Sequence, residues 1–183
     1  GASGLASLES RLGGEPRYTP VWVADQAVGL VGVYAVLAAL LYRERTGVGQ
    51  AIEVPMYEVL TQFVMTPHLY GHGFRPPMGD AGYVRLFERR PYKTLDGYIC
   101  ASPYNEEQWR RFFDLAGKPE LKSSPRYNGR EAIAKHIGEL YQMFADTIAT
   151  KTTAEWLVLL NDIDIPSMPL HSVDSVQEDP HLV

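Results

Sequence analysis

The chain has 183 residues, of which 45% are hydrophobic and 21% charged, and its formal net charge is −5. This length is enough for one ordinary domain or two small ones. The negative charge excludes a general electrostatic attraction to nucleic acid, so we expect no nucleic-acid partner. The single cysteine, Cys100, cannot form an intramolecular disulfide, which is typical of a reducing compartment, and we expect a cytoplasmic protein.

The first half of the chain predicts a long apolar helix that begins near Asp25 and ends at Gly47. A short helix over 2–10 and a Gly/Pro-rich loop precede it. Gly47 suits the left-handed residue that terminates many helices. The apolar run 27–42 has sixteen residues, whereas a membrane span needs about 20. We therefore expect a buried core helix and no membrane partner.

A short strand over 51–54 and a helix over 56–69 follow, and the Gly/Pro-rich segment 70–84 reads as a linker. Beyond it, the Asp96-Gly97 pair predicts a β-hairpin. Cys100 lies in an apolar run there and reads as a small buried side chain. The other expected elements are a helix from Asn105, a helix over 130–149, a helix opened by a capping box at Thr152 and Glu155, a strand over 165–171 and a short helix over 174–183.

Asp25 at the start of the long helix has two interpretations. Asp is common at helix starts as a cap or first-turn anion, with a contribution of about 0.5–2 kcal/mol. An ionised carboxylate can also act as a nucleophile on an activated acyl group. The local sequence leaves both interpretations open.

The wider pattern resembles the class III (CaiB/BaiF, formyl-CoA transferase-like) CoA-transferase family. The resemblance rests on Asp25, the Ala-rich helix and the Arg-x-Arg-Thr-Gly-x-Gly-Gln turn over 43–50. In the second half it rests on several separate motifs, which are Arg90 to Gly97, Gln108-Trp109, Thr153 to Trp156, Asp164 to Pro169 and the ending Asp179-Pro180-His181-Leu182.

The resemblance implies an α/β protein in which residues 1–69 are part of a Rossmann-like large domain, mostly helices plus a short strand. Residues 85–183 then form a small α+β domain with an antiparallel hairpin sheet and helices, after a linker over 70–84. The family's N-terminal half has no counterpart here, so the chain resembles an internal fragment. The family forms interlocked dimers, which implies a homo-oligomer.

The resemblance further implies that Asp25 is the catalytic carboxylate. Coenzyme A would pass from an acyl-CoA thioester to a carboxylic acid through an aspartyl-CoA thioester, so CoA is a substrate and no cofactor is permanently bound. Gly79 and Gly82 are candidates for a supporting glycine loop. The family also contains α-methylacyl-CoA racemases, in which Asp25 would shuttle a proton with support from Glu106. A third alternative is an inactive module with an assembly role.

Three arginines near the linker, Arg85, Arg89 and Arg90, could attract a phosphate of CoA. A solvated loop face is the commoner explanation for such a cluster. We expect no metal site, because His68 and His72 are one helical turn apart but no third ligand is evident.

Overall fold

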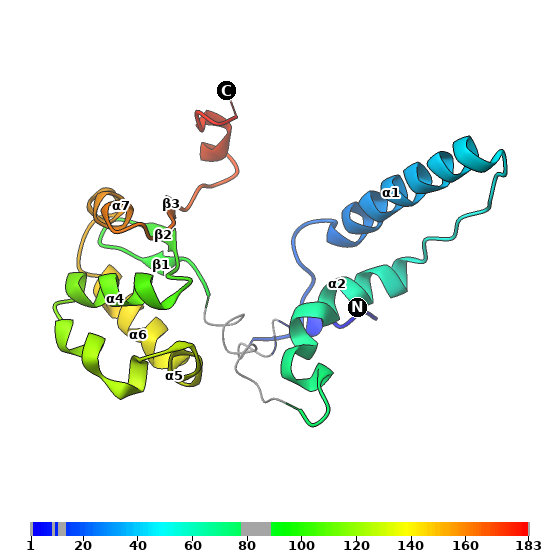
Figure 1. The fold of residues 1–183 in the computed structure, drawn as a ribbon. Coiled ribbons are helices and arrows are strands. Elements are labelled where there is room, and N and C mark those ends of the chain that lie inside the picture. Colours follow the sequence, from blue (N-terminus) through cyan, green and yellow to red (C-terminus); the bar gives the residue numbers. More distant parts are fainter. Residues whose placement is uncertain (1, 9, 11–13, 78–88, 183) are drawn as a thin grey trace. The chain divides into compact units, whose positions relative to one another are not determined.

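The computed structural model describes residues 2–8, 10, 14–77 and 89–182. The chain divides into two compact units, Gly1–Gly79 and Asp80–Val183 (Figure 1). This division falls within the segment 70–84 that the sequence predicts as a linker. Helices make up most of the regular structure, and a small antiparallel sheet of three strands lies in the second unit.

The first unit is built on two helices that contact each other, α1 (Val23–Thr46) and α2 (Met56–Leu69). Two short 3₁₀ helices, η1 (Leu5–Ser7) and η3 (Tyr70–Gly73), flank this pair in the sequence. The predicted strand over 51–54 is wrong, because residues 51–55 have no regular secondary structure. A strand needs a neighbour to pair with, and the described part of this unit contains none.

Helix α1 is not covered as a core helix would be. None of its residues is buried, and Leu30, Val33 and Leu37 are 68%, 57% and 59% exposed. The expectation of a buried helix is therefore wrong for this chain, since α1 is apolar around most of its circumference and α2 can cover one side. By length and composition alone α1 could also cross a membrane, a test that core helices and signal sequences pass as well.

The end of α1 follows the predicted termination at Gly47. This residue has a φ of 73°, in the left-handed region, and its amide donates to the carbonyl of Arg43 at 2.8 Å. The Thr46 hydroxyl donates to the carbonyl of Tyr42 at 2.8 Å and accepts from the Val48 amide at 3.2 Å. The turn motif therefore closes the helix through the backbone amide of Gly47 and the side chain of Thr46.

The second unit contains the predicted hairpin, formed by β1 (Tyr92–Lys93) and β2 (Tyr98–Ala101), and a third strand, β3 (Ser167–Pro169). The strands are antiparallel in the order β1-β2-β3. Side chains alternate along β2, so Ile99 is buried and Cys100 is exposed. The expectation of a buried Cys100 is therefore wrong.

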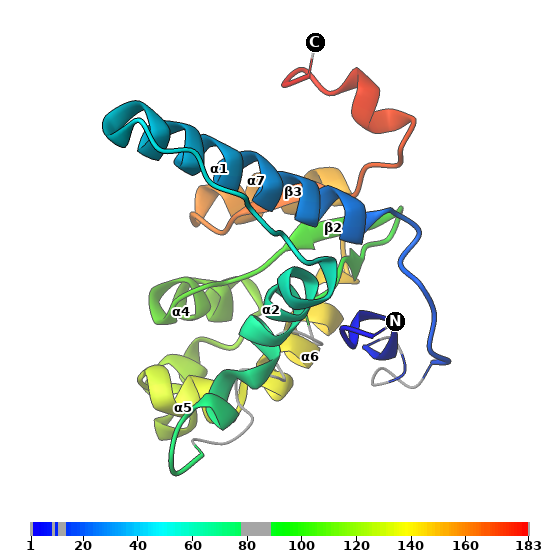
Figure 2. The ribbon, with the colours of Figure 1, turned by 90° about the vertical axis from the view of Figure 1, so that its right-hand side faces the viewer.

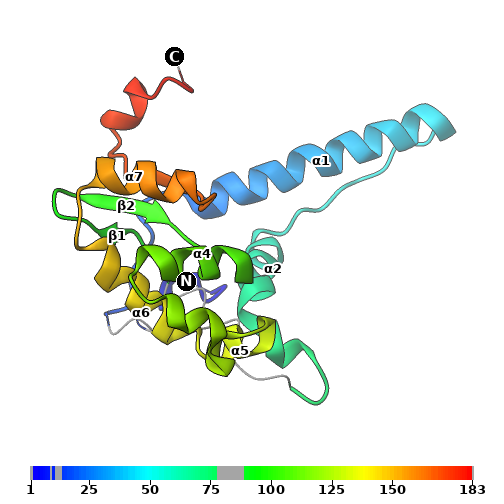
Figure 3. The ribbon, with the colours of Figure 1, turned by 60° about the vertical axis from the view of Figure 1, so that its left-hand side comes forward.

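Helices α4 and α6 lie on one side of this sheet (Figures 2 and 3). The α-helices of the second unit are α4 (Glu106–Leu115), α5 (Arg130–Lys135), α6 (Ile137–Ile148) and α7 (Thr153–Asp162), and its 3₁₀ helices are η4 (Pro119–Ser123), η5 (Pro125–Tyr127) and η6 (Ser175–Glu178). The predicted single helix over 130–149 is wrong, because the backbone of His136 (φ −110°, ψ 20°) leaves helical geometry and separates α5 from α6. Where a last helix over 174–183 is predicted, the structure has only the short 3₁₀ helix η6 among the described residues.

The core of the second unit is aromatic. The ring centroid of Phe144 lies 4.6 Å from that of Phe112, 4.8 Å from that of Tyr92 and 6.1 Å from that of Trp109. All four side chains are buried. Such clusters bring together elements that are far apart in the sequence, here β1, α4 and α6, and hold them as one body.

Candidate active site around Asp25

Asp25 is the third residue of α1 and lies in its first turn. The N-cap residue is Trp22, which makes no side-chain capping bond, so Asp25 is a first-turn anion and not the cap. The positive end of the helix dipole favours a negative charge at this place. The residue is exposed, and its carboxylate is therefore accessible to a reactant.

The carboxylate has no hydrogen bond or ion pair to any other described residue. A carboxylate that serves a structural role normally accepts bonds from nearby donors, as Glu155 does in the second unit. Asp25 therefore keeps its lone pairs available for chemistry.

A cavity of about 750 Å³ lies beside Asp25. Its wall is formed by η1, by the segment that leads into α1, and by Leu60 of α2. Among the described lining residues Asp25 alone is charged, and the others include Leu5, Val21 and Trp22. The wall beside this carboxylate is therefore mostly apolar.

The sequence-predicted supporting residues do not all fall within the described structure. Gly79, Gly82 and Arg85 lie outside the described residues. Glu106 belongs to the second unit and starts α4, where its Oε1 accepts from the amide of Gly129 at 3.1 Å. Glu106 thus has a local structural partner within its own unit.

The two other candidate arginines, Arg89 and Arg90, lie within the described structure and are exposed. Arg89 donates from Nε to the hydroxyl of Tyr141 at 3.2 Å, and its guanidinium lies 4.9 Å from the ring centroid of Tyr104. Arg89 lines a pocket of about 320 Å³ in the second unit, together with Glu106. Arg90 lines a different hollow beside β2 and β3.

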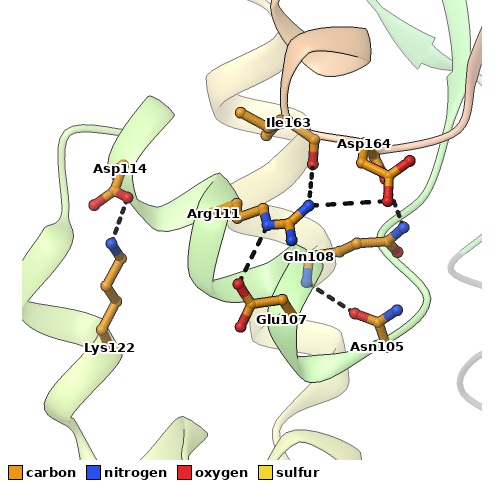
Figure 4. Close-up of polar contacts among 8 residues, drawn as sticks. All are labelled: Asn105, Glu107, Gln108, Arg111, Asp114, Lys122, Ile163 and Asp164. Carbon is orange, nitrogen blue, oxygen red and sulfur yellow. Dashed lines mark hydrogen bonds and ion pairs between the residues drawn. The ribbon is translucent and has the colours of Figure 1, made fainter.

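Sequence reasoning missed the two buried hydrogen bonds of the Gln108 side chain; Figure 4 shows the one to Asp164. This side chain is 8% exposed; its Oε1 accepts from the amide of Tyr104 at 2.7 Å, and its Nε2 donates to the carbonyl of Asp164 at 2.7 Å. Asp164 has a φ of 60°, which few non-glycine residues adopt. The Gln108-Trp109 motif was the sequence signal for this position, and the hydrogen bonds of Gln108 give the motif a structural role.

Arg111, one turn along α4 from Gln108, makes further contacts with the same turn (Figure 4). Arg111 pairs with Glu107 at 3.2 Å and donates to the carbonyl of Ile163 at 3.3 Å, while its guanidinium lies 3.8 Å from the carboxylate of Asp164. The start of α4 is therefore tied to the turn between α7 and β3. This explains the Asp-Ile-Pro motif as a structural element.

Two carboxylates of the second unit have lowered pKa values because they accept bonds at the start of α7. The backbone amide of Thr153, followed by its hydroxyl, lowers the pKa of Asp96. The hydroxyl and then the amide of Thr152 lower the pKa of Glu155, which completes the predicted capping box. Among the described residues, no three His, Cys, Asp or Glu side chains come together as metal ligands.

Residues 1–183, the whole length of the chain, match the family described as CoA-transferase family III. The chain belongs to this family, as the motifs indicate. It is 30% identical over 179 residues to the probable fatty acyl-CoA transferase Rv3272 of Mycobacterium tuberculosis, covering 91% of this chain and 45% of that protein. It is 26% identical over 185 residues to the succinate–glutarate CoA-transferase of Agrobacterium fabrum, covering 100% of this chain and 46% of that protein.

The fold agrees with this assignment. A crystal structure of Rv3272 from Mycobacterium tuberculosis matches 99% of this chain and 48% of that chain, with a TM-score of 0.76 and 29% identity. The mostly helical chain with its small three-stranded sheet therefore corresponds to part of that structure. The chain spans less than half the length of these relatives.

Proposed function

We propose that the protein to which this chain corresponds transfers coenzyme A from an acyl-CoA thioester to a carboxylic acid, and that Asp25 is the nucleophile. The observation that carries the proposal is the Asp25 carboxylate, exposed at the start of α1, without a described partner, and beside a mostly apolar cavity. Membership of CoA-transferase family III supports it, as do the reported relatives, whose names are those of CoA-transferases.

The reaction balances without an external oxidant, reductant or net proton. An oxygen of Asp25 attacks the thioester carbonyl, the carbon–sulfur bond breaks, and a mixed anhydride and CoA thiolate result. The thiolate attacks the aspartyl carbonyl carbon, so the donor carboxylate leaves and an aspartyl-CoA thioester remains. The acceptor carboxylate attacks this thioester, and the released thiolate then attacks the acceptor carbonyl, which frees Asp25.

Both anhydrides and the thioester react through tetrahedral oxyanions, which need hydrogen-bond donors. The first amides of an α-helix have no partner within the helix. In α1 the amide of Gln26 is the one that donates to the carbonyl of Trp22, at 3.1 Å. The amides of residues 23–25 before it are therefore candidate donors beside Asp25, and a glycine loop at Gly79 and Gly82 is a further candidate.

The same family resemblance allows a racemase, in which Asp25 would move an α-proton and Glu106 would assist. The reported relatives support transfer instead. We propose further that residues 1–69 are part of a Rossmann-like α/β large domain. We also propose a cytoplasmic homo-oligomer. The exposed apolar side chains of α1 support an assembly that covers them.

The test measures new acyl-CoA thioesters formed by the purified chain from succinyl-CoA and glutarate, and from a fatty acyl-CoA and succinate. Asp25→Asn should lower the rate by about a thousandfold or more, because the covalent route is lost. Asp174→Asn is the matched control, an exposed aspartate whose side chain caps no helix, and it should transfer at the rate of the unaltered chain. A measurable transfer rate that is equal in Asp25→Asn and Asp174→Asn would overturn the assignment, whereas no transfer by the unaltered chain would support the inactive module. Exchange of an α-proton in D₂O without a new thioester would support the racemase instead.

A further inference from the structure

The cavity of about 750 Å³ beside Asp25 lies wholly within the first unit. Its described wall comes from η1, from the segment that leads into α1, from the first turn of α1 and from Leu60 of α2. The volume lies within the range of small-molecule sites. The cavity therefore has room for the chain of an acyl group as well as for its carbonyl, and the chemistry of the wall decides which chains fit.

The charges on this wall disfavour a second carboxylate. Asp25 is the one charged side chain among the described lining residues, and Arg17, which directly precedes the lining segment 18–26, is not among them. A carboxylate at the far end of a bound acyl group would meet no cation on the described wall and would be repelled by Asp25. Loss of hydration without a partner also costs such a group free energy.

The same wall favours hydrocarbon. Tyr18, Val21 and Trp22 line the cavity and are 80%, 60% and 80% exposed. An aliphatic chain that lies against them removes apolar surface of both the ligand and the protein from water. The two aromatic rings provide a large contact area for this. The free energy of binding should therefore become more favourable as the chain lengthens.

We propose that this cavity binds the aliphatic chain of an uncharged acyl group and discriminates against acyl groups that end in a second carboxylate. The inference rests on the proposed function, because it places the acyl carbonyl beside the Asp25 carboxylate. It adds the class of acyl group, and it assigns the selection to the segment 18–22, which takes no part in the covalent steps.

The experiment measures binding of acyl thioesters of N-acetylcysteamine to the full chain. These probes lack the nucleotide of CoA, so their binding needs no contacts to phosphate. The hexanoyl and adipoyl thioesters are a matched pair, because their acyl groups have equal numbers of carbons and differ in the terminal carboxylate. The butyryl and octanoyl thioesters vary the chain length.

Trp22 reports on occupancy of the cavity. It is 80% exposed, whereas the two other tryptophans of the chain, Trp109 and Trp156, are each 1% exposed. A ligand that covers Trp22 should shift its emission to shorter wavelength and protect it from quenching by acrylamide. The buried tryptophans of the second unit should contribute a constant background.

The hexanoyl thioester should shift the emission saturably, and the adipoyl thioester should bind at least about tenfold more weakly. Each added methylene should strengthen binding about three- to fourfold, the ratio that corresponds to the transfer of one methylene out of water. In Asp25→Asn the affinity for the hexanoyl thioester should stay the same, while the difference between the two probes should shrink because the repulsion is removed.

Val21→Arg places a cation on the wall and should strengthen adipoyl binding about tenfold while it weakens hexanoyl binding. Val48→Arg is the matched control, because Val48 is 56% exposed in the loop after α1 and does not line the cavity. It adds the same charge to the chain and should leave both affinities unchanged. General damage to the fold would weaken binding of both probes and would not reverse the preference.

The inference is overturned if the hexanoyl thioester gives no saturable shift, if the adipoyl thioester binds as tightly, or if Val21→Arg alters the preference no more than Val48→Arg does. These binding results do not depend on turnover. A chain that prefers the hexanoyl probe but transfers CoA equally well as Asp25→Asn would contradict the proposed nucleophile and would still support the selectivity of the wall.

Discussion

The side chain of Asp96, in the turn of the hairpin, accepts hydrogen bonds from the backbone amide of Thr153 at 2.8 Å and from its hydroxyl at 2.9 Å. Thr94 adds a third bond to the same oxygen at 3.0 Å. Thr153 is the first residue of α7, so a strand turn and a helix start that are 57 residues apart share one carboxylate. The Thr-x-Asp-Gly motif therefore joins two elements of the second unit.

Replacing Asp96 by Asn should lower the melting temperature of the chain, because the charged acceptor at the start of α7 is lost. The effect should depend on pH. The pKa of Asp96 is lowered below its ordinary value of 3.8 by the amide and hydroxyl of Thr153, so its contribution is present above that value and is lost as the pH falls through the lowered pKa.

Thermal unfolding of the unaltered chain and of Asp96→Asn between pH 7 and pH 2 measures this pH dependence. The difference in melting temperature should be constant near neutral pH and shrink in acid. A difference that stays the same throughout this range would show that the charge of Asp96 has no part in stability.

Gln108→Leu should destabilise the second unit by about 1–3 kcal/mol, since the Tyr104 amide and the Asp164 carbonyl lose their buried partner. Gln142→Leu is the matched control, because Gln142 is exposed and bonds to Asp146 on the same helix, and it should change stability by less than about 0.5 kcal/mol. Urea unfolding followed by tryptophan fluorescence gives both values. Equal effects of the two substitutions would contradict a stabilising role for the buried hydrogen bonds of Gln108.

Phe144→Ala should cost about 3–5 kcal/mol, because the ring is fully buried among Phe112, Tyr92 and Trp109. Val158→Ala, at a position that is 62% exposed on α7, provides the comparison and should be nearly neutral. Calorimetry of the two variants tests the placement of the core. A small effect at Phe144 would mean that α6 packs elsewhere.

Glu139 should titrate far below an ordinary glutamate. Its pKa is lowered from 4.5 to about 2, first by its hydrogen bond with Arg126 and then by bonds from Tyr127 and His136. Its contribution to stability is thus present above the ordinary value and lost as the pH falls toward about 2. In Arg126→Gln the pKa should rise toward 4.5. Carbon-13 NMR of the side-chain carboxyl follows both titrations, and an identical midpoint in the two proteins would disprove the pairing.

Local signals predicted much of the second unit. The Asp-Gly turn, the Asn105 cap and the capping box at Thr152 and Glu155 each depend on contacts within a few residues, and all three form. The break at His136 was not predictable in this way, because the apolar spacing continues across it. The same applies to Gln108, whose partner Asp164 lies 56 residues away.

The first unit was harder to predict for a different reason. The helix pattern gave the extent of α1 and α2 closely, since both are set by local spacing and end signals. Strand formation over 51–54 and burial of α1 depend instead on neighbours distant in the sequence. For Asp25, the position in the first turn of α1 was predictable from local sequence. The adjoining cavity was not, because η1 and Leu60 of α2, which are distant in the sequence, form part of its wall.

The most direct test of the central claim is to trap the covalent intermediate. The purified chain and its Asp25→Asn variant are incubated with an acyl-CoA and then with hydroxylamine, and the peptides are analysed by mass spectrometry. An aspartyl anhydride or thioester reacts with hydroxylamine to form a hydroxamate at that residue. We expect this modification at Asp25 of the unaltered chain and its absence from the variant. An unmodified Asp25 under conditions in which the chain forms new acyl-CoA would contradict the account.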